Sequence, residues 1–291
     1  MLAAQQAVAP DAQQLVPVDP WYRSVGRRRT RALVRTTMRD PLSGGLPPMY
    51  AAAAEHLKAV AILPEDEGEA WSATYTMLQV LRQPGAGPWH TGSVGTVTLR
   101  RSANRSGSVD LRADVLHALG HGLRDRYAAD ITSVADAERS LIEWRRESFF
   151  EAIQPGLDSS PRRADTGKVS GGHLIRRPGG RSRERFDERQ PLVAQWTLFD
   201  TVRGLKGPVR FAMLEGMDVA RMNQTMRPVP IEPIEVATAS GTVPLRCILQ
   251  TGDGILPTTW WLAPSGLPLM VLANCRAFVL SPGAGMPEMP T

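Results

Sequence analysis

Two histidines, His117 and His121, have a spacing that could bind a metal. On a helix, an H-x3-H spacing brings both imidazoles to one face, as in zinc proteases. Here no glutamate lies between them to serve as a base, glycines stand at 120 and 122, and the segment alternates with a period of two. This alternation is typical of a strand. We therefore expect no metal site, and we place His121 at the tip of a hairpin.

The alternation predicts a β-hairpin with strands over residues 109–119 and 123–132. With a three-residue loop, the residue numbers of each cross-strand pair add up to 242. In that register apolar residues face apolar residues and charge faces countercharge, which supports the hairpin independently of strand propensity. The pairs are Val115 with Tyr127, Leu111 with Ile131, and Arg112 with Asp130.

The same register places His117 opposite Asp125. A carboxylate at that position would fix the imidazole tautomer and raise the pKa of His117. Such a pair is half of a nucleophile-activating triad, so a hydrolase-like enzyme with His117 and Asp125 as catalytic residues is one hypothesis. A structural hydrogen bond at the rim of a sheet is the alternative. No G-x-S-x-G motif supplies a nucleophile, no phosphate-binding loop is recognisable, and we expect no cofactor.

The stretch 243–280 predicts consecutive antiparallel strands joined by short turns, with Trp260 and Trp261 in the middle strand. Neighbours in a strand point to opposite faces, so one ring packs in the core and the other faces a helix layer or solvent. These two rings and Tyr127 are the candidate ligand-binding residues. Cys247 and Cys275 lie in strands that are not neighbours, beyond the reach of a disulfide. We expect two free, buried thiols.

The remaining pattern predicts a mainly β (α+β) domain over residues 49–291, built as a curved antiparallel sheet or half-barrel with two covering helices. The expected helices are 49–63 and 191–205, with a short additional helix at 135–141. Residues 155–190 are rich in Gly, Pro, Ser and Arg and predict a long basic loop with at most a short strand pair. Further strands are expected at 71–77, 94–100, 142–150 (Trp144 and Phe150 buried), 209–213 and 234–239.

The net charge of +5 is unevenly distributed. Residues 23–39 contain seven arginines and no acid, and residues 161–190 carry nine basic against four acidic residues, so the rest of the chain is negative. Residues 1–48 predict an extended Arg/Pro-rich arm. The candidate partner-binding residues are Arg27, Arg28, Arg29 and Arg31, for a protein with an acidic surface. Aromatic residues are scarce in the second basic segment, so we do not expect nucleic acid.

No apolar run approaches the roughly 18–20 residues that span a bilayer, so we expect a soluble chain without a transmembrane segment. The first twenty residues are rich in Ala, Gln and Pro and lack the basic start of a signal peptide. The sequence therefore shows no N-terminal targeting signal.

The order of two segments carries a resemblance: Gln190–Asp200 (QPLVAQWTLFD), followed by Leu256–Leu262 (LPTTWWL) and Gly266–Leu269 (GLPL). Over residues 70–282 the chain resembles uncharacterised exported bacterial proteins that are similar in outline to half-barrel lipid and lipoprotein carriers. The resemblance implies a periplasmic location and a concave apolar binding face, and it carries over no catalytic residues.

These observations favour a non-enzymatic binding or accessory protein. It would hold a hydrophobic small molecule on a concave sheet or dock onto a larger assembly. The alternatives are the hydrolase-like enzyme described above and a structural subunit of a multiprotein complex, whose arm and loops become ordered only on assembly.

Overall fold

The computed structural model describes residues 48–62, 70–81, 90–102, 107–120, 123–153, 158–177, 182–185, 190–273 and 275–282. The chain divides into two compact units, residues 1–45 and 46–291, and every described residue belongs to the second. Four arginines of the predicted arm, residues 27, 28, 29 and 31, and the predicted hairpin tip, His121, lie outside the described residues.

The helical elements are α3 (Pro48–Leu57), η1 (Gln195–Thr197), α4 (Leu198–Thr201) and η2 (Val202–Gly204). The first eight strands are β1 (Trp71–Leu81), β2 (His90–Ser102), β3 (Ser108–Gly120), β4 (Leu123–Val134), β5 (Leu141–Ala152), β6 (Arg163–Ser170), β7 (His173–Arg177) and β8 (Ser182–Arg185). The others are β9 (Leu192–Ala194), β10 (Val209–Glu215), β11 (Val219–Pro228), β12 (Ile234–Thr238), β13 (Gly241–Thr251), β14 (Thr258–Leu262), β15 (Pro268–Ala273) and β16 (Arg276–Leu280).

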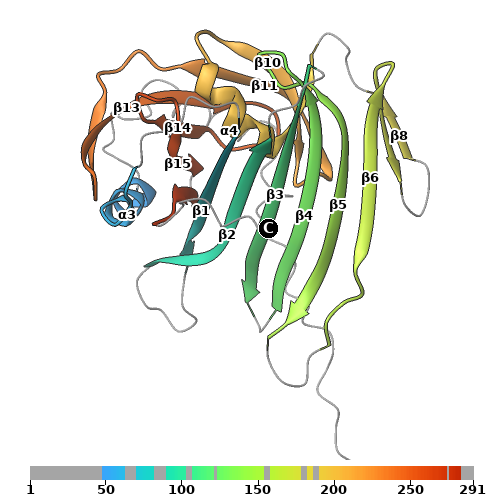
Figure 1. The fold of residues 1–291 in the computed structure, drawn as a ribbon, viewed down its shortest axis with the longest axis horizontal. Coiled ribbons are helices and arrows are strands. Elements are labelled where there is room, and N and C mark those ends of the chain that lie inside the picture. The colour runs from blue at the N-terminus through green and yellow to red at the C-terminus, as the bar shows by residue number, and fades with distance from the viewer. Residues whose placement is uncertain are drawn as a thin grey trace, which may run out of the picture. The chain divides into compact units, whose positions relative to one another are not determined.

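These strands form one curved sheet (Figure 1). Its hydrogen-bonded order is β8, β7, β6, β5, β4, β3, β2, β1, β16, β15, β14, β13, β11, β10 and β9, and β12 pairs with the start of β13. The β9 end of the sheet folds back onto an interior strand, because Val193 of β9 forms an antiparallel bridge with Ser140, just before β5. The predicted mainly β fold, a curved half-barrel with two short helices, is confirmed.

The predicted β3–β4 hairpin is confirmed residue by residue. Val115 pairs with Tyr127, Leu111 with Ile131, Arg112 with Asp130, and His117 with Asp125. The Arg112 guanidinium lies 2.9 Å from the Asp130 carboxylate, so the charge pairing that fixed the register is also formed.

The segment predicted as a helix over 191–205 begins instead as a strand. β9 pairs in parallel with β10, and the Ala212 N–H donates to the Pro191 carbonyl at 2.8 Å. Helical turns follow only from Gln195 and end at Gly204. We call residues 195–204 the inner segment. Long-range pairing with β10 overrides the local helical pattern here.

The inner segment packs on one face of the sheet, the inner face, and α3 packs on the other, the outer face. Phe199 contacts Trp260 with ring centroids 5.0 Å apart, whereas Tyr50 of α3 contacts Trp261 at 5.6 Å. The two tryptophans therefore point to opposite faces, as predicted, and both are buried.

Asp200 fixes the inner segment against the sheet. Its buried carboxylate accepts a hydrogen bond from Trp71 Nε1 at 3.0 Å and forms ion pairs with Arg139 and Arg101. At the C-terminal end of the segment, Arg246 donates to the carbonyls of Leu205, Val202 and Arg203. Side chains from distant parts of the chain thus hold the middle and the end of this short segment.

Several predictions of secondary structure were wrong. Residues 135–139 form no helix; instead Asp136 Oδ1 accepts the Ser140 N–H. The predicted basic loop contains β6, β7 and β8, of which only the Val169–Leu174 pairing was expected. The first helix ends at Leu57 instead of 63.

Two burial predictions also failed. Phe150 is 46% exposed, because nothing among the described residues covers that end of β5, whereas Trp144 on the same face is buried as predicted. Cys275 is exposed because it lies in the turn between β15 and β16. Both cysteines are free, as expected, and Cys247 is buried.

Candidate functional site

One row of residues crosses the inner face from β16 to β5. The strand registers place these six positions side by side: Phe278, Met77, Gly95, His117, Asp125 and Phe150. We call them the border row, because the inner segment covers the face on one side of it. The exposed fraction rises from 4% at Met77 to 46% at Phe150. The row therefore leads from the core to an open part of the sheet.

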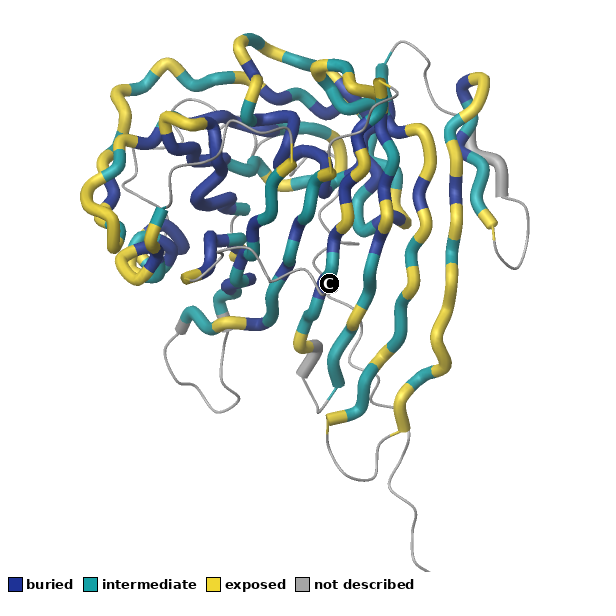
Figure 2. The backbone as a smooth tube through the Cα atoms, viewed as in Figure 1, coloured by how far each residue is buried: buried dark blue, intermediate teal, exposed yellow. Residues whose placement is uncertain are grey.

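Trp196 marks the edge of the inner segment at this row. Its Nε1 donates a hydrogen bond to Tyr127 Oη at 3.1 Å, and its ring contacts Phe278 edge-on at 5.8 Å. Figure 2 shows buried residues where the sheet encloses the inner segment, and intermediate and exposed residues toward the far ends of β3, β4 and β5. The apolar concave face that the resemblance implies is thus largely filled by the chain itself.

Several polar side chains in and beside the border row, a surface that we call the wall, have few or no partners. Within the described residues, the side chains of His117, Asp125 and Arg276 make no hydrogen bond or ion pair. Tyr127 accepts the Trp196 N–H but gives its own hydroxyl proton to no described acceptor. Arg276 is exposed and the other three side chains are of intermediate exposure, so these polar groups can form hydrogen bonds with molecules from solution.

The electrostatics differ from the sequence-based expectation. The pKa of His117 is lowered, first by burial and then by the positive charge of Arg276. The predicted rise was therefore wrong. Burial raises the pKa of Asp125, against the opposing effect of Arg146. Burial also raises the pKa of Tyr127 far above its usual value. Each shift favours the neutral form, which suits hydrogen bonding more than proton transfer.

The hydrolase hypothesis gains no support from this arrangement. His117 and Asp125 are cross-strand neighbours, but no hydrogen bond joins their side chains. The nearest inner-face hydroxyl on the next strand is Ser148, opposite Tyr127. It lies two strand spacings from His117, roughly 10 Å, with the Asp125 strand between them. In a triad the histidine stands between the other two groups. The catalytic roles remain a prediction.

Of the predicted ligand-binding residues, only Tyr127 lies next to the border row, two residues from Asp125. Trp260 donates its N–H to Gln250 at 3.0 Å and Trp261 donates to Thr259 at 3.1 Å, and both rings lie in the core. Their role in ligand binding remains a prediction. Sequence reasoning missed Arg276. The sequence does show that Arg276 and Phe278 alternate in one strand and so share a face. It does not show that this strand, β16, lies in the same sheet as β3, because β1 and β2 stand between them.

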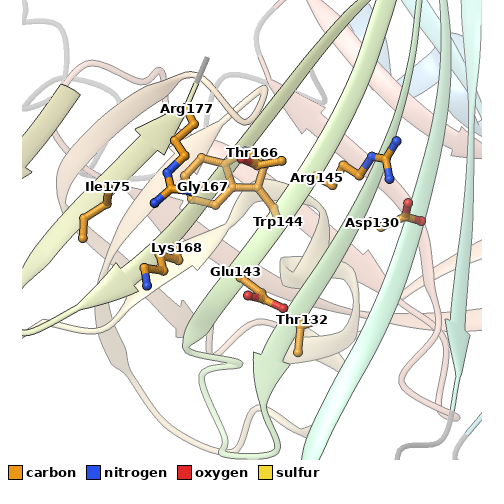
Figure 3. A pocket seen from close by; sticks show the side chains of 10 residues that line it. All are labelled: Asp130, Thr132, Glu143, Trp144, Arg145, Thr166, Gly167, Lys168, Ile175 and Arg177. Atoms are coloured by element: carbon orange, nitrogen blue, oxygen red, sulfur yellow. The ribbon is translucent and has the colours of Figure 1, made fainter. Parts of the chain in front are cut away.

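An open pocket of about 340 Å³ lies on the outer face over β4, β5, β6 and β7 (Figure 3). Its charged side chains are Asp130, Glu143, Arg145, Lys168 and Arg177. They come from cross-strand positions on the face opposite Ile131 and Trp144, and they alternate in sign. Arg145 and Asp130 are engaged with Glu147 and Arg112. This ladder of opposite charges is typical of a solvated sheet face.

The described part of the chain contains no group of three or more His, Cys, Asp or Glu side chains arranged to hold a metal ion. No helix in that part has the length and apolarity required to cross a membrane.

Comparison with known proteins gives little guidance. No family model and no curated protein matches the chain. Among solved structures, the chain is similar to the beta-barrel-like protein of domain of unknown function DUF1849 from Brucella abortus, with a TM-score of 0.43 and 10% identity. The match covers 72% of this chain and 94% of that one. We draw no conclusion about family or function from this likeness.

Proposed function

We propose that the protein is a non-enzymatic binding protein that holds a small molecule against the inner face of its sheet, at the border row. The observation that carries this proposal is a set of neighbouring polar groups that have hydrogen-bonding capacity left within the described residues: His117, Asp125 and the Tyr127 hydroxyl, which are of intermediate exposure, and Arg276, which is exposed. A ligand that supplies their partners would be held by several directed hydrogen bonds, and the adjacent aromatic rings would supply apolar contact.

The position of the inner segment supports this choice of site. Trp196 and Phe199 occupy the deeper part of the inner face, where they contact Tyr127, Tyr75, Trp260 and Phe278. A ligand that bound there would have to displace rings anchored by the Asp200 ion pairs. Beyond the border row no such displacement is needed.

The Arg-rich arm extends the proposal from ligand to partner. Arg27, Arg28, Arg29 and Arg31 would tether the protein to an acidic protein surface, as part of an accessory role. Because every strand of the described structure lies within residues 46–291, removal of residues 1–45 should abolish retention on immobilised polyglutamate while the circular dichroism spectrum keeps its β signal. Equal retention of the two forms at low salt would contradict the tether.

Native mass spectrometry tests the binding role. The protein, purified and then incubated with a small-molecule extract of the producing cells, should retain one additional small mass per chain. The double variant His117→Ala/Asp125→Ala should lose it, whereas Glu143→Ala/Arg145→Ala on the outer face should keep it. A bare chain, or a mass that only the outer-face variant loses, would refute the proposal.

A further inference from the structure

We propose that the ligand is a single anionic amphiphile, whose acidic head group lies between Arg276 and His117 and whose apolar part extends toward Phe150. This inference rests on the proposed function and specifies its ligand class. It is argued from three features of the inner face: a cation without an ion pair among the described residues, a glycine over which Met77 packs beside His117, and an apolar end.

Arg276 is the cation. It begins β16, pairs with Gln79 and Ala273, and shares its face with Phe278 two residues later. The side chain is exposed and has no ion pair or hydrogen bond within the described residues. Its positive charge acts to lower the pKa of both His117 and Tyr127, so the guanidinium lies near these two groups, in the strand that also carries Phe278.

Gly95 lies in the border row between Met77 and His117. An added Cβ at this position would lie 1.9 Å from the Leu116 carbonyl oxygen and 2.6 Å from Met77 Cε. Only glycine fits here, because the Met77 side chain and the Leu116 carbonyl occupy the place of a side chain. Met77 therefore packs over Gly95, and the wall beside His117 is apolar and closed at this point.

The other cation on this wall, Arg146, is already paired. Its guanidinium is held by the Asp165 carboxylate and by the Gly216 carbonyl. Arg276 has no ion pair within the described residues, and an anionic head group would supply one. Neutral His117 and the Tyr127 hydroxyl are further donors to a carboxylate or phosphate oxygen.

The far end of the wall is apolar. Phe150 is 46% exposed on the inner face, and the next row pairs Leu123 with Ala152. These residues lie on β4 and β5, one and two strand spacings beyond His117, or roughly 10 Å at most. A ligand with its head at Arg276 and His117 reaches them with an alkyl chain, which explains why so large an aromatic surface is left uncovered.

Isothermal titration calorimetry tests the ligand class with dodecanoate, kept below its critical micelle concentration, and with dodecyltrimethylammonium as the cationic match. Dodecanoate should bind one molecule per chain, and the ammonium probe should bind at least about tenfold more weakly. Arg276→Gln should weaken dodecanoate binding by about tenfold or more. The matched control Arg227→Gln, an exposed arginine on β11, should leave it unchanged.

Three results would overturn the inference: equal affinity for both probes, dodecanoate binding unaffected by Arg276→Gln, or binding to phosphatidylglycerol vesicles without binding to monomeric dodecanoate. Arg276 is exposed and unpartnered, so its variant should fold, and a circular dichroism melt checks this. Dodecanoate could fail to bind while native mass spectrometry still shows a retained mass that depends on His117 and Asp125. That result would contradict the proposed ligand class and would leave the proposed binding role supported.

Discussion

Trp196 donates its indole N–H to the hydroxyl oxygen of Tyr127, at 3.1 Å, across 69 residues of sequence. This bond joins the edge of the inner segment to the β4 strand, two residues from Asp125. The packing that fills the core therefore contacts the polar wall of the candidate site at Tyr127.

Replacement of Tyr127 by Phe should leave the Trp196 N–H buried without an acceptor. A buried donor that loses its partner costs about 1–2 kcal/mol, and urea unfolding should show a loss of stability of that size. Tyr50→Phe is the matched control, because the Tyr50 ring is equally well packed but its hydroxyl has no hydrogen bond within the described residues. A similar loss in both variants would show that the Trp196 contact contributes nothing specific.

Asp200→Asn should be far more costly. The carboxylate is 6% exposed and faces two arginines, so the neutral amide leaves their charges uncompensated. Removal of one partner from a buried ion pair costs about 3 kcal/mol or more, and chemical denaturation measures it. Asp114→Asn, in the half-exposed pairs with Arg100 and Arg112, should cost less than about 1 kcal/mol. Equal losses would mean that Asp200 does not anchor the inner segment.

The lowered pKa of His117 predicts a pH-dependent contribution to stability. Because the folded state resists protonation of the imidazole, this contribution is complete above the unfolded pKa of about 6.5 and is lost as the pH falls through the folded value. His117→Gln should therefore gain stability relative to wild type as the pH is lowered from 7 to 5. Denaturation midpoints across this range measure the difference, and parallel profiles would contradict the shift.

Asp125 should behave in the opposite sense. Its pKa is raised in the folded state, so the neutral carboxyl favours folding at low pH and this advantage is lost as the pH rises through the folded pKa. Asp125→Asn should be more stable than wild type at pH 7, and its advantage should shrink toward pH 4. A constant difference at all pH values would mean that burial of the charge is not the cause.

The two thiols should differ sharply in reactivity. Burial raises the pKa of Cys247 to about 12, whereas Cys275 is exposed. Iodoacetamide at pH 8 should modify one cysteine in the native protein and two in denaturant, as counted by mass spectrometry. Cys275→Ser should remove the native reaction. Two rapid modifications of the folded protein would show that the β13 strand is accessible.

Local patterns predicted the hairpin and the meander correctly, because period-two alternation and a three-residue loop fix a register without information from elsewhere in the chain. The pairing of His117 with Asp125 followed from that register. The two faces of Trp260 and Trp261 followed from the same period.

The remainder depends on residues far apart in sequence. β9 is extended because β10 and Ser140 pair with it, which a helical stripe over 191–205 cannot reveal. Arg276 reaches the wall of His117 only because β16 and β3 are joined through β1 and β2. The basic stretch hid three strands, since its Gly- and Arg-rich composition shows no alternation until β5 provides a partner.

Photo-cross-linking tests the central claim, that the border row and Arg276 form a ligand-binding wall, most directly. Dodecanoic acid with a diazirine next to its carboxylate would be irradiated with the protein, and the adducts mapped by peptide mass spectrometry. We predict adducts on peptides that contain His117, Asp125, Tyr127 or Arg276, suppressed by excess dodecanoate. Adducts confined to the outer-face pocket around Glu143 and Lys168, or adducts that excess dodecanoate does not suppress, would contradict the claim.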